Sequence, residues 1–76
     1  MDLNKDYSNI LLALSDKGGT GNIMEILNYS PSQFEDGFMI DNQMQNMDLV
    51  KLLYSNFNKN TIVVELTLLG ENKKQT

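Results

Sequence analysis

The hydrophobic periodicity changes near residue 47, and this change constrains the fold more than any other feature of the chain. Before that point, apolar residues recur at steps of three and four, which is typical of one face of a helix; examples are Leu11, Leu14, Phe34, Ile40 and Met44. After it, residues 61–67 are rich in β-branched side chains, as in a strand. This order predicts an α+β fold in which three helices precede a two-stranded antiparallel hairpin.

Glycine and asparagine mark the bounds of the first two helices. The first is expected over residues 4–16, and Gly18-Gly19 ends it because glycine tolerates the left-handed backbone of a helix C-terminus. The second is short, over residues 22–28. Asn22 can cap it, with Glu25 three positions later as in a capping box.

The third helix has the clearest local signal. In the segment Ser30-Pro31-Ser32-Gln33, serine can cap the helix, proline suits its first position, and glutamine can close a capping box. The helix is expected to run from residue 31 to residue 46. Asp41 and Gln45 fall within its apolar stripe and interrupt the pattern.

The hairpin is expected in residues 49–67, with a polar turn over residues 56–60. Residues 48–55 also fit a continued helix, because Leu49, Leu52 and Leu53 share helical spacing; we favour the strand. Gly70 is expected to break the second strand, and residues 71–76 form a polar tail. The core is expected to contain seven apolar residues: Leu11, Leu14, Ile26, Leu27, Phe34, Ile40 and Leu66.

Composition bounds the function. The 76 residues suit a single domain, with an ordered core over about residues 4–71. The chain has no cysteine and no histidine, so thiolate and imidazole chemistry are excluded; we expect no enzyme, no metal site and no cofactor. No apolar run approaches the ~20 residues of a membrane span, and a soluble cytoplasmic protein is expected. Residues 18–21 (GGTG) lack the preceding strand and the following Gly-Lys of a phosphate loop, so we expect a helix–helix connection there.

The order of the expected elements resembles that of the winged helix-turn-helix superfamily. Residues 44–51 (MQNMDLVK) look like its passage from recognition helix to wing, although Asp48 stands where glycine is more usual. Residues 64–71 (VELTLLGE) resemble the strand that closes many wings. Residues 30–36 (SPSQFED) are similar to small YjcQ-like winged-helix proteins of phages and Gram-positive bacteria. The resemblance implies a DNA-binding or regulatory domain with its third helix in the major groove, and we expect a regulator from a phage, plasmid or similar element. The short hairpin, an exposed Met39 and the small core predict a homodimer, with its contact in the first helix or the C-terminal segment.

The resemblance implies that the third helix and the hairpin form the DNA-binding surface. Carboxamide side chains can read adenine edges and lysines can contact phosphates; the candidates are Ser32, Gln33, Asn42, Gln43, Asn46, Lys51 and Lys59, with weaker contacts from Lys73 and Lys74. The opposing interpretation is an ordinary solvated helix face. Ten carboxylates outnumber six lysines, arginine is absent, and the net charge is −4. Glu35, Asp36 and Asp41 lie on the third helix and would repel the phosphates of DNA, which argues against DNA binding.

The alternative function is a protein–protein interaction module that does not bind DNA directly. Met39 is expected on the exposed face of the third helix, and Phe57 lies in the polar hairpin loop. Exposed apolar side chains on an acidic surface suit a protein partner. Phe57 has a second interpretation, in which it packs locally over the hairpin.

Overall fold

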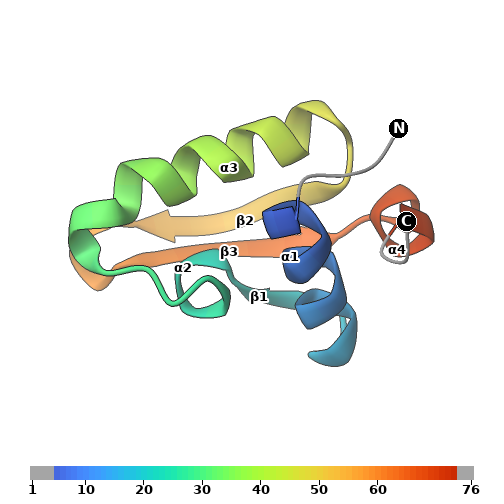
Figure 1. The fold of residues 1–76 in the computed structure, drawn as a ribbon, viewed down its shortest axis with the longest axis horizontal. Coiled ribbons are helices and arrows are strands. Elements are labelled where there is room, and N and C mark those ends of the chain that lie inside the picture. The colour runs from blue at the N-terminus through green and yellow to red at the C-terminus, as the bar shows by residue number, and fades with distance from the viewer. Residues whose placement is uncertain (1–4, 74–76) are drawn as a thin grey trace.

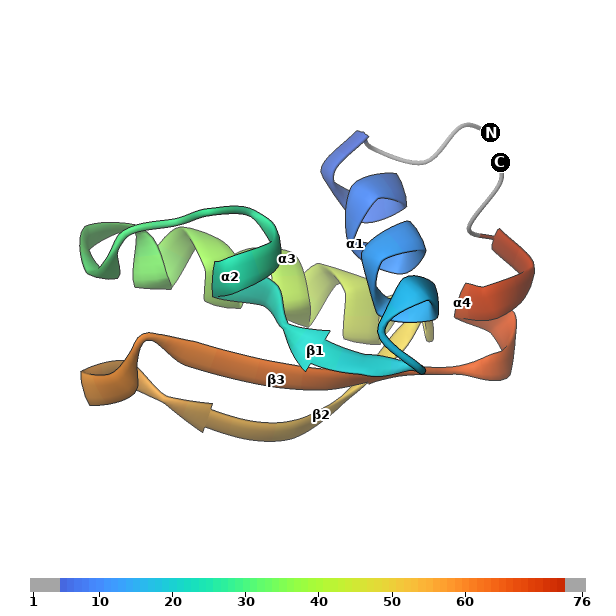
Figure 2. The same ribbon diagram turned by 90° about the horizontal axis from the view of Figure 1, so that it is seen from below.

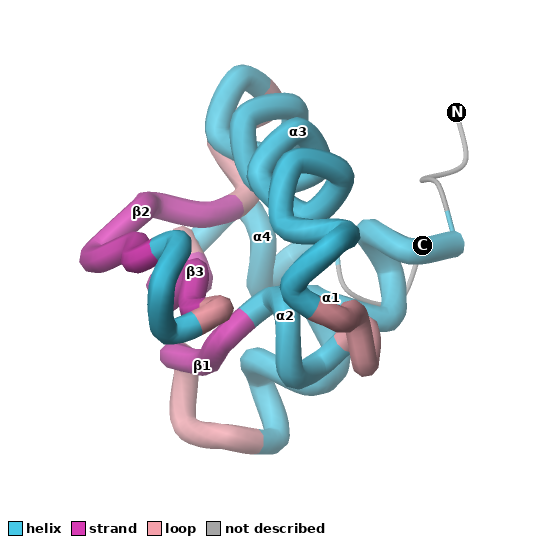
Figure 3. The backbone as a smooth tube through the Cα atoms, turned by 90° about the vertical axis from the view of Figure 1, so that its left-hand side faces the viewer, coloured by secondary structure: helices cyan, strands magenta, loops and turns pink. Residues whose placement is uncertain are grey.

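The computed structural model describes residues 5–73, which form a three-stranded antiparallel sheet with helices α1, α2 and α3 on one of its faces (Figures 1 and 2). Figure 3 shows the same two layers end on. The elements in chain order are α1 (Lys5–Asp16), β1 (Thr20–Asn22), α2 (Ile23–Ile26), α3 (Phe34–Asn46), β2 (Val50–Asn56), β3 (Thr61–Leu66) and α4 (Leu68–Lys73). The α+β class is therefore confirmed.

The first helix ends as predicted, but the segment after it is not a simple connection between helices. Gly18 and Gly19 have φ values of 86° and 104°, and the Gly19 N–H donates to the Leu14 carbonyl at 2.7 Å. The chain then enters β1, where Gly21 pairs with Val64 of β3. The predicted two-stranded hairpin is thus a three-stranded sheet of order β1-β3-β2. Three residues, one of them glycine, carry no strand signal of their own, so their pairing depends on β3.

Asn22 caps the second helix as predicted and also joins it to the sheet. Its Oδ1 accepts hydrogen bonds from the N–H of Met24 at 3.1 Å and of Ile62 at 2.9 Å. The helix itself is a single turn that stops at Ile26, short of the predicted residue 28. Asn28 has a φ of 57°, which lies outside helical geometry.

The third helix ends at Asn46 as predicted, but its α-helical part begins at Phe34, three residues after the predicted start. A 3-10 helix, Pro31–Gln33, leads into α3, and the Ser30 N–H donates to Gln33 Oε1 at 3.0 Å. Asp48, with a φ of 60°, takes the left-handed conformation at the C-terminal end of α3 that glycine usually supplies. β2 follows at once, so the strand interpretation of residues 48–55 is confirmed over the helical one.

The core lies between the helices and the inner face of the sheet. Leu11 and Leu14 are fully buried, as predicted. The other five predicted core residues are partly buried around that centre. The remaining buried hydrophobic residues are Ile10, Ile23, Met24, Met44, Leu49, Val50, Ile62 and Val64. Ile62 and Val64 alternate along β3, which places its other face, with Glu65, towards solvent.

The C-terminal segment forms a helix where a break at Gly70 and a polar tail from residue 71 were predicted. Thr67 caps α4, because its Oγ1 accepts from the Gly70 N–H at 2.9 Å. The same hydroxyl donates to the Asp48 carbonyl at 2.6 Å, and the Thr67 N–H donates to the Leu49 carbonyl at 3.1 Å. α4 contacts α1 at one end of the molecule (Figure 2). Residues 74–76 of the predicted tail lie outside the described residues.

Candidate functional site

The outer face of α3 carries the side chains that its periodicity predicts. Glu35, Asp36, Met39, Asn42, Gln43 and Asn46 are all exposed, and Met39 keeps 59% of its accessible surface. Neither α3 nor the 3-10 helix before it contains a lysine. The exposed face of α3 is therefore acidic and polar, with one large apolar side chain.

Several of the candidate DNA-reading side chains already have hydrogen-bond partners within the protein. Gln33 Oε1 accepts from the Ser30 N–H, and Ser32 Oγ lies 2.8 Å from Ser30 Oγ. Gln43 Oε1 accepts from the hydroxyl of Tyr7 in α1. A carboxamide reads adenine with its oxygen and its nitrogen together, so these bonds restrict the orientations in which Gln33 and Gln43 could do so. Asn42 and Asn46 are exposed near the middle and the end of α3.

The candidate lysines lie on different sides of the molecule. Lys51 sits between buried Val50 and half-buried Leu52 on β2, so it points to the outer face of the sheet, opposite Glu65. The helices cover the other face. Lys59 is exposed at the tip of the hairpin, in the 3-10 helix Phe57–Lys59. Lys73 lies in α4, and Lys74 falls outside the described residues. The structure does not bring the described candidates, Lys51, Lys59 and Lys73, together beside the exposed face of α3.

Asp41 does not face the solvent, contrary to the prediction that it would repel phosphates. It is 0% exposed, and its Oδ2 accepts from Gln45 Nε2 at 2.8 Å. Oδ1 has no hydrogen-bond partner among residues 5–73. Burial raises the pKa of this carboxyl, although the bond from Gln45 opposes that effect. The position of Asp41 within the apolar stripe was the sequence signal for this burial.

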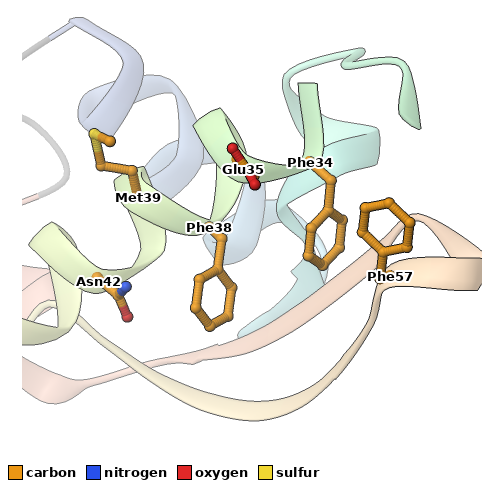
Figure 4. A pocket seen from close by; sticks show the side chains of 6 residues that line it. All are labelled: Phe34, Glu35, Phe38, Met39, Asn42 and Phe57. Atoms are coloured by element: carbon orange, nitrogen blue, oxygen red, sulfur yellow. The ribbon is translucent and has the colours of Figure 1, made fainter. Parts of the chain in front are cut away.

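A groove of about 410 Å³ lies between α3 and the tip of the hairpin (Figure 4). We call it the aromatic groove; it is lined by Phe34, Glu35, Phe38, Met39, Asn42 and Phe57. The rings of Phe34 and Phe57 meet edge to face at 5.2 Å, and those of Phe34 and Phe38 are stacked at 6.1 Å between centroids.

The aromatic groove brings together the two residues that were proposed as a partner interface. Met39 contributes from α3, and Phe57 contributes from the hairpin. Phe57 packs locally against Phe34, yet it remains 64% exposed. Phe34 was predicted as a core residue, and neither Phe34 nor Phe38 was predicted to line a surface site; both are partly buried. Their four-residue spacing, which places both on one side of α3, was the available signal.

Comparisons of the chain with protein-family models, curated proteins and solved structures found no match. Within residues 5–73, no three carboxylates gather closely enough to hold a metal ion. None of the helices in that part of the chain is both long and apolar enough to cross a membrane.

Proposed function

We propose that this protein is a small winged-helix-like module that binds a protein partner through the aromatic groove and performs no catalysis. The order of α1, α2 and α3, followed by the β2–β3 hairpin, supports the winged-helix assignment. The observation that carries the function is the groove itself. It places exposed aromatic and methionine side chains between α3 and the hairpin tip. In the winged-helix superfamily, the third helix is the element that recognises the partner DNA.

The exposed apolar surface favours a protein partner. Phe57 and Met39 keep 64% and 59% of their accessible surface in a chain with a small core. Leaving large apolar side chains in water costs about 25 cal/mol for each Å² that a partner would otherwise cover. Aromatic residues and methionine are enriched at protein interfaces, and charged residues are depleted from interface centres. The groove has this composition, with Glu35 as its one charged lining residue.

The charge distribution disfavours DNA as the partner of the same face. DNA binding depends on lysines and arginines that neutralise phosphates. α3 offers Glu35 and Asp36 in its first turn and no cation along its length. Lys51 faces the other side of the sheet, which leaves Lys59 as the nearest cation of the hairpin tip.

A site-specific cross-linking experiment tests this proposal. A photoreactive phenylalanine analogue is placed at position 39, and separately at the control position 68, where Leu68 is 81% exposed on α4. In cells that express the protein, we expect a discrete protein adduct from position 39 and none from position 68. The adduct should disappear when Phe57→Ser is added. A groove-specific partner would be refuted if both positions gave equal amounts of adduct, or if the adduct from position 39 persisted when Phe57→Ser was added.

DNA binding is the second candidate function, favoured by the exposure of Asn42, Asn46 and Lys59. A regulator of this kind would act as a homodimer. Leu68 of α4 and Leu12 of α1, which is 44% exposed, are available for the dimer contact.

Gel retardation with mixed genomic fragments at low salt, together with sedimentation, tests this candidate. A regulator would show a dimer, a salt slope near −0.9 per phosphate contact, and uniformly weaker binding in Lys59→Ala. Asn42→Ala would weaken only the preferred site. A lack of retardation at tens of micromolar protein would exclude this candidate.

A further inference from the structure

We propose that the aromatic groove receives a peptide segment that carries a large apolar side chain next to a lysine or arginine. This inference rests on the proposed function and specifies the chemistry of the partner. The apolar side chain would enter between α3 and the hairpin tip. The cation would lie over the α3 side of the groove, at Glu35.

The shape of the groove explains why the segment must carry a large apolar side chain. Its volume of about 410 Å³ falls within the usual range for ligand pockets, roughly 300–1,000 Å³. The rings of Phe34 and Phe38 project from the same side of α3, and the ring of Phe57 lies next to Phe34 from the hairpin side (Figure 4). Aromatic walls at these positions fit an inserted aliphatic or aromatic side chain, which gains dispersion contacts with several rings.

The charges around the groove explain why a lysine or arginine must lie next to that apolar side chain. Glu35 lines the groove and Asp36 follows it, and both are exposed in the first turn of α3. No lysine occurs between Lys17 and Lys51 in the sequence, so α3 brings no cation to this rim. Lys59 lies two residues from Phe57 on the opposite, hairpin side. A segment with its cation towards α3 therefore meets a carboxylate and avoids Lys59.

The rings add a further attraction for the same cation. A lysine or arginine within about 6 Å of an aromatic centroid is attracted to the face of the ring, by about 0.5–1 kcal/mol at exposed sites. Glu35 lines the same groove and lies on α3 between the points where Phe34 and Phe38 leave the helix (Figure 4). Both attractions select a cationic over an anionic segment. The net charge of −4 steers the encounter in the same direction.

Three synthetic peptides of equal length test this inference. The first is an amphipathic peptide with leucine and tryptophan at helical i, i+4 and i+7 positions, flanked by lysines. The second replaces every lysine with glutamate, and the third replaces the three apolar anchors with alanine. Binding to the ¹⁵N-labelled protein is followed by amide shifts. We expect the first peptide to shift groove amides at positions 34, 38, 39 and 57, and the other two to bind at least tenfold more weakly.

Charge reversal in the protein supplies the decisive readout. Glu35→Lys should weaken the lysine peptide and strengthen the glutamate peptide, so the preference reverses. Phe57→Ser should weaken the lysine peptide by at least tenfold. Leu68→Ser is the matched control, because it removes an exposed leucine on α4, and it should leave both affinities unchanged.

The outcomes distinguish this inference from the proposed function. Suppose the glutamate peptide binds the groove as tightly as the lysine peptide, and Glu35→Lys changes neither affinity. The charge requirement is then refuted, while the groove remains a protein-binding site. If no peptide shifts the groove amides, the inference is refuted by itself, and the cross-linking at position 39 decides the proposed function independently.

Discussion

The replacement Gly70→Ala tests how α4 is held against the sheet. A Cβ at Gly70 would collide with the Leu49 carbonyl oxygen, and it would also lie 2.9 Å from Leu66 Cδ1 and 3.1 Å from the Leu49 carbonyl carbon. Ordinary contact begins at 3.4 Å. Two of these three atoms belong to the backbone, so the whole of α4 has to move away from residue 49.

The expected loss of folding stability in Gly70→Ala combines two destabilising contributions and one stabilising contribution. Overpacking of this kind costs about 1–3 kcal/mol. Movement of α4 also strains the Thr67 cap, which contributes roughly 1 kcal/mol. Alanine recovers about 0.5–1 kcal/mol of helix propensity. The free energy of unfolding should therefore fall by about 2 kcal/mol. With a urea dependence near 1 kcal/mol/M for so small a domain, the midpoint should fall by about 2 M.

Gly37→Ala is the matched control for urea unfolding. Gly37 is also buried and helical, but its Cβ would meet the sulfur of Met24, a flexible side chain, and Ile62 Cδ1 at 3.6 Å. We expect this variant to stay within about 1 kcal/mol of the parent, because the thioether can adjust. Hydrogen exchange should also show faster exchange in α4 for Gly70→Ala alone. If Gly70→Ala is as stable as the parent, or more stable than Gly37→Ala, the packing argument fails.

Three further predictions concern stability. Burial raises the pKa of Asp41 above its ordinary value of 3.8, so folding favours the neutral carboxyl. The stability that this carboxyl contributes is therefore complete below the unfolded pKa and is lost as pH rises through the folded pKa. Asp41→Asn should therefore gain stability relative to the parent between pH 4 and pH 7; a pH-independent difference in urea midpoints would contradict this. Phe34→Ala should cost about 2–3 kcal/mol, less than a fully buried phenylalanine, because Phe34 is half-buried; thermal unfolding measures it, and no loss would contradict the packing. Asn22→Ala should cost about 2–4 kcal/mol, because it leaves the N–H groups of Met24 and Ile62 without their acceptor, and the exposed Asn9→Ala should be nearly neutral.

The elements with local signals could be predicted from the sequence. Ser30 and Gln33 bond each other across three residues, and Gly18 and Gly19 turn the chain with their own backbone freedom. The outer face of α3, with Met39 exposed, follows from helical spacing alone. In each of these cases the interacting residues lie within about one helical turn, so the sequence pattern contains the whole interaction.

Two elements depended on residues far away in the chain. β1 is only three residues long, and it is a strand because β3 pairs with it some 40 positions later and because Asn22 reaches the Ile62 N–H. α4 forms where Thr67 is fixed by the carbonyls of Asp48 and Leu49. Local propensity at either place was weak, so tertiary pairing decided the conformation.

The aromatic groove was only partly visible in the sequence. Its residues on α3 share one helical face, and Phe57 stood out as an aromatic side chain in a polar loop. Their meeting required the hairpin tip to fold back over the start of α3, which brings Phe57 to 5.2 Å from Phe34, 23 positions earlier. The sequence by itself determined which side chains were apolar and which face of α3 they occupied. Only the tertiary structure decided which of them meet, because contacts between separate elements depend on sheet pairing and close packing rather than on local spacing.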